Sequence, residues 1–522
     1  MRLRTIFLPV FAVAALAGCA DSGESPAEPV PANGDAAYLS VRIETRKTTR
    51  SSGESPGEDE SDLQKLCFIA FNDRGTVVKA PGTTGYFTEI SPVTATSEVF
   101  KVSSGTVQLL AIANPGPKLE AVLRGMNGTT TYGTFNEAVT AAGVTEIADD
   151  TRDIDRGFAM INSGDETDRD AGDVIADPLI DVSDNVVTIS KDMDAEAARE
   201  AAGDNPAEVK IERLASKVAL TLADEITVRP EGADFTFGHW TLDALNTAFY
   251  PFAEKTLLEV SHTAGGSYVR NFYTRDPNFS GAVGEGIDNA TVDADTFEPV
   301  LVEPYDWMIA DSLTYCVENT MAAGEQRFGN ATRVVIRGTY YPKDYSGDWF
   351  NFAGRNFADL AELQLACSKA GSGSNLAAAC KKMFDKIEAY AAVHNIRLEG
   401  SDFASLKEAD LAAVSNGGEV LKEGREDIIR WYQDGLCYYY YEIVHDNETQ
   451  VEQDFGKYGV VRNNWYALTL GSVDGPGTPW YPDIDEPGPG DPDPEDPIDG
   501  SGYLGITVEV APWIVWETGI GL

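Results

Sequence analysis

Two similar stretches, one near each end of the chain, decide how this sequence is interpreted. Residues 503–510 read YLGITVEV and residues 38–45 read YLSVRIET, with Tyr, Leu and Glu at matching offsets. Both stretches alternate apolar and other residues, which is the period of a half-buried β-strand. Leu39, Val41 and Ile43 would share the core-facing side of the first strand. The corresponding residues of the last strand are Leu504, Ile506, Val508 and Val510.

This likeness has two interpretations. Two ordinary strands in a β-rich chain could agree by chance. Alternatively, the strands are interchangeable: the first can leave its sheet, and the last strand of a neighbouring molecule can fill the place. Residues 475–502 are dense in Pro, Asp and Gly, which is typical of an extended, stiff linker. Such a linker would hold the last strand away from the body, so that it can reach a neighbour.

The composition fits an exported, solvated protein. A chain of 522 residues is too long for one hydrophobic core, which predicts two or three domains. Hydrophobic residues make up 43% of the chain, enough for it to fold, and the formal net charge is −44. Such acidity excludes nucleic acid as a partner, because nucleic-acid binding needs a basic footprint. It favours an extracellular surface.

The first 19 residues are expected to form a lipoprotein signal peptide. Arg2 and Arg4 precede a short apolar run, and residues 16–19 read LAGC, which matches the bacterial lipoprotein signal. In that signal Cys19 takes the lipid, so acylation would anchor the exported precursor to a membrane. The alternative is a plain secretory signal that happens to contain a cysteine. No other apolar run approaches the ~18–20 residues needed to span a bilayer.

Residues 20–50 are expected to form a propeptide that contains the displaceable first strand. Its end, residues 45–52, reads TRKTTRSS and runs into an acidic stretch. Arginines in a polar, unstructured stretch are good protease targets, which makes Arg46 and Arg50 the candidate cleavage sites. The alternative is a solvated loop that is never cut.

Strand signals dominate the rest of the chain. We expect one β-domain over residues 51–206 and a second over residues 207–474, in which residues 209–222 form one long strand. Residues 475–522 would then be the linker and the donor strand. Trp513 and Val515 would continue the apolar side of that strand.

A helical region interrupts the second domain. Over residues 349–424 the strand pattern gives way to helical spacing, which predicts an inserted helical subregion. The residues expected on the buried helical face are Leu376, Cys380, Phe384 and Ile387.

The sequence offers no catalytic or metal-binding constellation. Its four histidines form no metal-ligand pair, and no Cys-x-x-Cys occurs. Residues 53–57 formally match the serine-hydrolase elbow but lie in an acidic linker, without the strand and helix that the elbow needs. Residues 165–173 are acidic but do not follow the spacing of a calcium loop. We therefore expect no enzyme activity, no metal and no cofactor.

The positions of the cysteines indicate one possible disulfide. With Cys19 lipidated, five remain, so at least one is free or pairs between molecules. Cys67 and Cys437 lie in strand patterns and are expected in the core. Cys367 and Cys380 flank a Gly/Ser turn between helical stretches and could form a disulfide in an oxidising compartment.

Several motifs, taken in order along the chain, resemble the fimbrillin family of Bacteroidota. These proteins are the major subunits of protease-assembled (type V) pili, and the likeness is greatest to the larger, minor-fimbria type of subunit. The motifs are NPG (114–116), IERLASKV (211–218), RDPNF (275–279), YCVENT (315–320), YYEIVH (440–445), KYGVVRNNWY (457–466) and the terminal strand (503–513). The resemblance implies a mainly β fold of two transthyretin-like β-sandwich domains, with helices inserted in the second. It also implies that an arginine-specific protease removes the first strand, after which the C-terminal strand of the next subunit is inserted.

On this basis we expect the repeating shaft subunit of a surface fimbria that supports adhesion and biofilm formation. Its implied partners are further copies of itself, accessory tip and anchor subunits, the maturation protease, and host or bacterial surface receptors. Before processing, the lipid would hold the precursor in the outer membrane. The alternatives are a lipid-anchored base or accessory subunit, and a monomeric glycan-binding surface lipoprotein.

Overall fold

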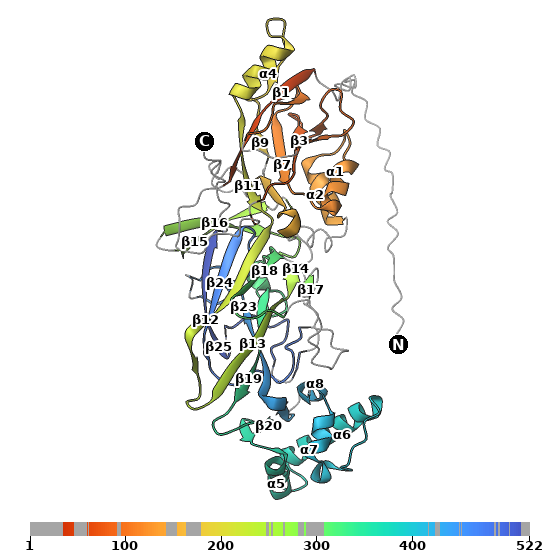
Figure 1. Ribbon diagram of the computed structural model, residues 1–522, viewed down its shortest axis with the longest axis vertical. Helices are drawn as coiled ribbons and strands as arrows, with labels where there is room; N and C mark the ends of the chain where they lie inside the picture. Colours follow the sequence, from red (N-terminus) through yellow and green to blue (C-terminus); the bar gives the residue numbers. More distant parts are fainter. Residues whose placement is uncertain are drawn as a thin grey trace, which may run out of the picture. The chain divides into compact units, whose positions relative to one another are not determined.

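The chain is mainly β, as predicted. Figure 1 shows the computed structural model. The structure describes residues 35–45, 60, 62–90, 96–141, 154–162, 179–246, 250–251, 254–264, 267–279, 287–288, 307–415, 417–422, 428–447, 449, 451–484, 487–488, 491–500 and 502–512. Within these ranges no helix combines the length and apolar character needed to cross a membrane.

Two sheets built largely from the first 213 residues enclose one core. The smaller sheet has the order β10-β1-β6, and the larger has the order β2-β11-β8-β7-β3-β4, with β5 beside β3 and β9 beside β7. The strands are β1 (Ala36–Leu39), β2 (Val41–Thr45), β3 (Leu66–Phe71), β4 (Val77–Val78), β5 (Phe87–Ile90), β6 (Phe100–Ser103), β7 (Gln108–Ala113), β8 (Met160–Asn162), β9 (Ile180–Asp181), β10 (Val187–Thr188) and β11 (Ala207–Arg213).

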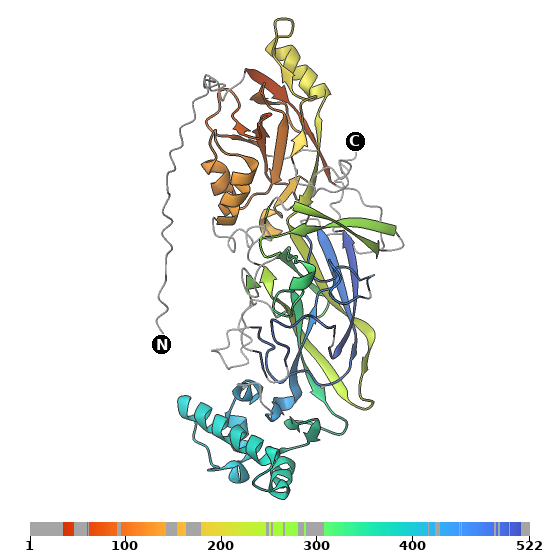
Figure 2. The ribbon, with the colours of Figure 1, turned by 180° about the vertical axis from the view of Figure 1, so that it is seen from behind.

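Both faces of the larger sheet are buried. Leu66 and Phe68 of β3 pack with Leu39 and Val102 in the core between the two sheets. The alternate residues of β3 pack on the other face against α1 (Pro117–Gly125) and α2 (Tyr132–Ala141). These helices lie together beside β3 and β7 (Figure 2). Burial on two sides explains why β3 is an unbroken apolar run rather than an alternating one.

A second pair of sheets encloses another core. One has the order β18-β12-β24-β25 and the other β13-β19-β23. Their inward residues, among them Leu220, Trp240, Ile336 and Leu468, form a single cluster. The strands are β12 (Ala215–Val228), β13 (Asp234–Asp243), β18 (Ser312–Val317), β19 (Arg333–Tyr341), β23 (Leu436–Glu442), β24 (Asn464–Val473) and β25 (Leu504–Pro512).

Three smaller sheets and a further helix accompany these two pairs of sheets. Two two-stranded sheets are made of β14 (Leu245–Asn246) with β17 (Ile287–Asp288) and of β15 (Glu254–Ala264) with β16 (Ser267–Arg275). A three-stranded sheet is made of β20 (Trp349–Phe352), β21 (Arg355–Phe357) and β22 (Arg430–Tyr432). Helix α4 (Ala195–Asp204) precedes β11.

The helical insertion lies where the spacing predicts it. Its helices are α5 (Leu360–Ala370), α6 (Asn375–Val393), α7 (Glu408–Ala413) and α8 (Gly417–Leu421), which gather together in Figure 1. Cys380, Phe384 and Ile387 of α6 are buried in their common core, and Leu376 packs against it. Asp359 and Ser374 cap α5 and α6 by accepting hydrogen bonds from backbone amides of the first turn.

One predicted strand is wrong in its extent. Residues 209–222 are parts of two strands, β11 and β12, separated by Leu214. β11 pairs with β2 and β8, whereas β12 pairs with β18 and β24. The chain changes sheets at Leu214, whose amide donates to the carbonyl of Ala159 (2.9 Å). The division into two domains stays a prediction, and sheet membership would move its boundary from 206/207 to Leu214.

The expected stiff linker also differs from the structure. Residues 475–502 do not hold the last strand away, because Trp480, Ile484 and Ile498 are buried and β25 pairs with β24 of the same chain. Trp480 packs in the core of the helical insertion, and its indole donates to Asp491 (2.8 Å). Burial of a few apolar side chains therefore attaches this stretch to the rest of the protein, despite its Pro/Asp/Gly-rich composition.

Two arginine–carboxylate pairs are buried beside the second core. Arg462 donates to both carboxylate oxygens of Glu318, and these side chains are 2% and 0% exposed. Glu318 also accepts from the Thr274 hydroxyl (2.6 Å). Arg333 and Asp243 form the other pair (2.6 Å). Loss of one member of either pair would leave the other as a buried charge without its counter-charge.

Replacing Glu318 with Ala should lower the free energy of unfolding by about 3–5 kcal/mol, because Arg462 would stay buried without its carboxylate. Chemical denaturation of the full chain measures this. The control is Lys381→Gln, which removes an exposed pair with Asp385 and should leave stability unchanged. Equal midpoints for the two variants would contradict the assigned role of the Glu318–Arg462 pair.

Candidate strand-exchange site

The first strand is divided between two sheets. β1 lies between β6 and β10 in the smaller sheet, whereas β2 runs parallel to β11 at the edge of the larger one. The chain switches at Ser40, whose carbonyl accepts from the amide of Ala207 (2.8 Å). The next residue, Val41, donates its amide to the Ser97 hydroxyl (3.0 Å) and accepts from the Ser97 amide (2.8 Å). One short stretch therefore belongs to both sheets of the first pair.

The side chains expected on the core side of this strand lie there. Leu39 and Val41 are fully buried between the two sheets, and Ile43 packs against the same core. Ala37, which we did not single out, continues the alternation and is equally buried. Tyr38 points to the opposite side and packs against Ala198 and Ala202 of α4. The first part of the strand is thus enclosed on both faces.

Removal of this strand would leave a specific opening. β6 and β10 would lose their shared neighbour, and β11 would lose the partner at its outer edge. The core between the sheets would lose Ala37, Leu39 and Val41. Unpaired backbone groups beside an apolar trough form a template for another strand.

The last strand is docked in its own chain. β25 pairs antiparallel with β24, from Val473↔Leu504 to Asn464↔Pro512, at one edge of the sheet. Val508 and Val510 are buried in the second core, and Leu504 and Ile506 pack against it. Glu509 is exposed. The apolar side predicted for the donor strand therefore packs against the core of its own chain.

A side chain outside the sheet also holds β25. The side-chain amide of Asn447 donates a hydrogen bond to the backbone carbonyl of Val508 (2.8 Å). The Asp474 amide donates to the carbonyl of Tyr503 (2.7 Å), just before the strand begins. Release of β25 would require these bonds to break along with its pairing to β24.

Glu60 fixes the chain shortly after the predicted cleavage sites. It is buried, and its carboxylate accepts from the Lys217 ammonium (2.8 Å) and the Tyr315 hydroxyl (2.7 Å). Its backbone carbonyl accepts from the Arg213 guanidinium (2.9 and 3.1 Å). Sequence reasoning missed this residue because it lies in an acidic run typical of a solvated loop. The segment is in fact attached to β11, β12 and β18.

The remaining predicted site residues lie outside the described residues. These are the lipidation site Cys19, the cleavage candidates Arg46 and Arg50, and Trp513 and Val515 of the donor strand.

The cysteines predicted in the core lie there. Cys67 in β3 and Cys437 in β23 are fully buried, and burial raises the pKa of each thiol to about 12. Cys367 and Cys380 lie in α5 and α6 as thiols.

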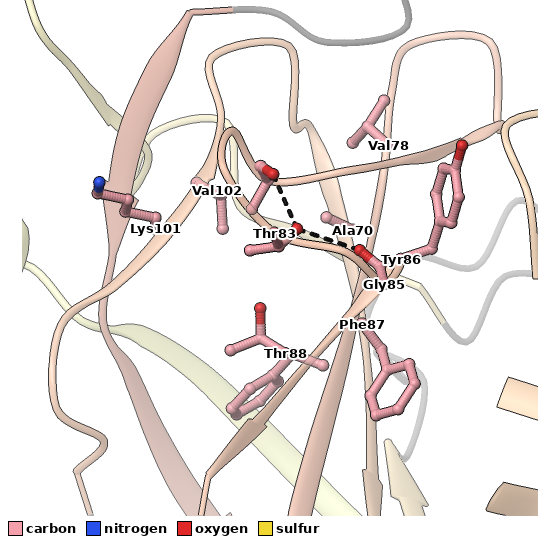
Figure 3. Close-up of a pocket in the computed structure, with 11 residues that line it drawn as sticks. Ala70, Val78, Thr83, Gly85, Tyr86, Phe87, Thr88, Lys101 and Val102 are labelled. Atoms are coloured by element: carbon pink, nitrogen blue, oxygen red, sulfur yellow. Dashed lines mark hydrogen bonds between the residues drawn. The ribbon is translucent and has the colours of Figure 1, made fainter. Parts of the chain in front are cut away.

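Figure 3 shows a small hollow lined by Thr83, Tyr86, Phe87 and Lys101 among others. Its volume is about 10 Å³, which is room for one water rather than a sugar or a substrate. The Thr83 hydroxyl lies within hydrogen-bond distance of the carbonyl oxygens of Ala80 (2.8 Å) and Gly85 (3.1 Å). Among the described residues, no group of three His, Cys, Asp or Glu is placed to hold a metal ion.

Solved structures similar to this chain include proteins from three Bacteroidales species. A candidate cell adhesion protein from Parabacteroides distasonis is 12% identical, with 92% of this chain and 98% of that chain covered and a TM-score of 0.42. One from Bacteroides eggerthii is 11% identical, covering 92% and 97%, with a TM-score of 0.38. The tip fimbrial protein Mfa3 from Porphyromonas gingivalis is 11% identical, covering 91% and 99%, with a TM-score of 0.32. At these TM-scores the superpositions carry no weight in the assignment. A comparison with curated proteins found no match.

Two family models match the chain, one near each end. The model of the major fimbrial subunit protein (FimA) matches residues 37–175, which include the first strand. The model of the C-terminal part of the major fimbrial subunit protein type IV, fimbrillin, matches residues 430–518, which include β24 and β25. Both describe fimbrial subunits, which points to a non-enzymatic protein at the cell surface. The chain belongs to the fimbrillin family of Bacteroidota.

Proposed function

We propose that this fimbrial protein is the repeating shaft subunit of a surface fimbria, joined head to tail by exchange of strands. One observation carries the proposal: the first strand is shared by two sheets, so its loss opens both at once. β25 has the matching alternation of apolar residues and lies at a sheet edge. An edge strand can leave its sheet by breaking the pairing with a single neighbouring strand.

The proposed order of events begins at the membrane. The precursor is acylated at Cys19 and is cut after Arg46 or Arg50 by a maturation protease. The first strand then leaves with the lipid, while Glu60 keeps the new N-terminal segment attached to the body. β25 of the next subunit fills the trough. Tip and anchor subunits would end the polymer, and receptors for adhesion and biofilm formation would bind its surface.

A terminal, accessory or lipid-anchored subunit is the second candidate. The docking of β25 in its own sheet favours it, because a subunit that keeps this strand offers none to a neighbour. Electron microscopy of cells that express the chain separates the two, since a shaft subunit gives filaments composed mainly of this protein.

Replacing both Arg46 and Arg50 with Ala should block maturation, because no arginine would remain in the polar stretch that follows the first strand. N-terminal sequencing of wild-type fimbriae should give Lys47 or Ser51, whereas the double variant should retain palmitate label at Cys19 and form no filaments. Arg42→Ala, a change of a half-exposed side chain within β2, is the control and should be processed normally. Wild-type fimbriae that still begin at Cys19 would make the protein an anchor.

A peptide of residues 502–522 should bind the processed subunit but not the precursor, whose trough is filled. The precursor is cut with an arginine-specific protease in the presence of labelled peptide, and binding is measured by fluorescence anisotropy. A Val508→Asp peptide should bind at least tenfold more weakly, since a buried large apolar side chain contributes ~1.5–3 kcal/mol. The matched Glu509→Lys peptide should bind like wild type. Equal binding of the peptide to precursor and processed subunit would refute the exchange.

Glu60→Ala should loosen the new N-terminal segment of the processed subunit, because Lys217 and Tyr315 would lose their carboxylate acceptor. Trypsin cleavage after Lys65 should become tenfold or more faster. Asp62→Ala, an exposed neighbour in the same acidic run, is the control and should leave the rate unchanged. If Glu60→Ala and wild type are cut at the same rate while both remain folded by circular dichroism, Glu60 is not the anchor.

A further inference from the structure

We propose that Cys367 and Cys380 form a disulfide that joins α5 to α6 of the helical insertion once the chain has left the cytoplasm. The inference rests on the proposed export of the protein but is independent of strand exchange.

The two helices form a short hairpin that brings these cysteines together. α5 ends at Ala370 and α6 begins at Asn375, and the chain reverses at Gly371, which has φ +80°. Cys380 is buried in the core of the insertion, and Cys367 packs against that core. The two cysteines are close enough to interact, since Cys367 adds to burial in raising the pKa of the Cys380 thiol. A disulfide requires the two sulfur atoms to close to about 2.05 Å, and the short turn holds the two helices side by side for that step.

The other described cysteines do not compete for this pairing. Cys67, Cys316 and Cys437 lie in β3, β18 and β23, outside the insertion, and each is 0–1% exposed. An oxidant in solution cannot reach them while the protein is folded. Cys367 is partly exposed, so oxidation would begin there.

The chemistry assigns different roles to the two sulfurs. Burial raises the pKa of the Cys380 thiol, which makes it the poorer initial nucleophile. The Cys367 thiolate attacks a disulfide oxidant and forms a mixed disulfide, which releases one thiol. The Cys380 sulfur then attacks the Cys367 sulfur and releases the second thiol. Two protein thiols lose two electrons and two protons, and the oxidant's disulfide is reduced to two thiols.

The pairing would stabilise the insertion against local unfolding. The bond closes a short loop across the α5–α6 turn and limits the freedom of the unfolded chain. The link would join the two helices on the side where both pack into the common core of the insertion.

The test is a peptide map of the full chain exported from cells and alkylated before lysis. Trypsin separates residues 356–369 from residues 370–381, so a disulfide joins two peptides whose combined mass is two hydrogens below their sum. We expect the linked species, and its loss on treatment with dithiothreitol. Reduction should also lower the melting temperature of the wild-type protein by several degrees and leave that of Cys367→Ser unchanged. Ser368→Ala, a neighbour in α5, is the control and should behave like wild type.

If the exported protein lacks the link, the purified chain is incubated with glutathione disulfide and mapped again. Alkylation of both cysteines in that sample, a link to a different cysteine, or a dimer on a non-reducing gel would overturn the proposal. Failure of the protein to form filaments would bear on the shaft role alone, because the peptide map does not depend on assembly.

Discussion

The switch at Ser40 is the constraint on which the rest of the first half depends. A strand confined to one sheet could be lost with little effect on the other. Here β1 completes the smaller sheet, and β2 covers the edge of the larger one. The core between them is closed by alternate residues of the same stretch, including Leu39 and Val41. A single cleavage near this stretch can therefore act on two sheets and on their shared core.

In the proposed exchange, burial of the four aliphatic side chains would not decide where the last strand is more stable, and backbone pairing would contribute more than they do. Leu504, Ile506, Val508 and Val510 contribute ~1.5–3 kcal/mol each when buried, but they are already in contact with the core of their own chain. Transfer to a neighbour would exchange one apolar surface for another. In the described residues β25 pairs with β24 alone, whereas β1 has a neighbour on each side. Hydrogen bonds on the second side, at about 0.5–1.5 kcal/mol each, can offset the ~4–15 kcal/mol cost of association.

The sequence predicts what depends on local periodicity and misses what depends on distant contacts. Alternation placed Leu39, Val41 and Val508 correctly, and helical spacing placed Cys380 and its neighbours. The sheet change at Leu214 lies inside an uninterrupted strand-like pattern, so no local signal marks it. Glu60 and Trp480 lie in runs whose average composition indicates solvent, and each is buried by partners more than 10 residues away, such as Lys217 and Asp491. Composition averages over a window and cannot identify a single anchored side chain.

The alignment of the two strands would give the proposed exchange a specific register. When the two sequences are aligned with Tyr503 opposite Tyr38, Gly505 falls opposite Ser40. Ser40 is the position at which the chain passes from one sheet to the other. Gly505 already lies at an irregularity of its own sheet, where the register with β24 shifts and a Cβ would lie 2.2 Å from the Ser472 hydroxyl. A small residue at this position fits both the sheet of its own chain and the proposed site in the neighbouring subunit. Tyr503 is 48% exposed in its own chain, whereas Tyr38 is buried against α4. In the proposed joint Tyr503 would take the place of Tyr38, so the transfer would bury an aromatic ring that the docked strand leaves in water and would favour the neighbour over the parent chain.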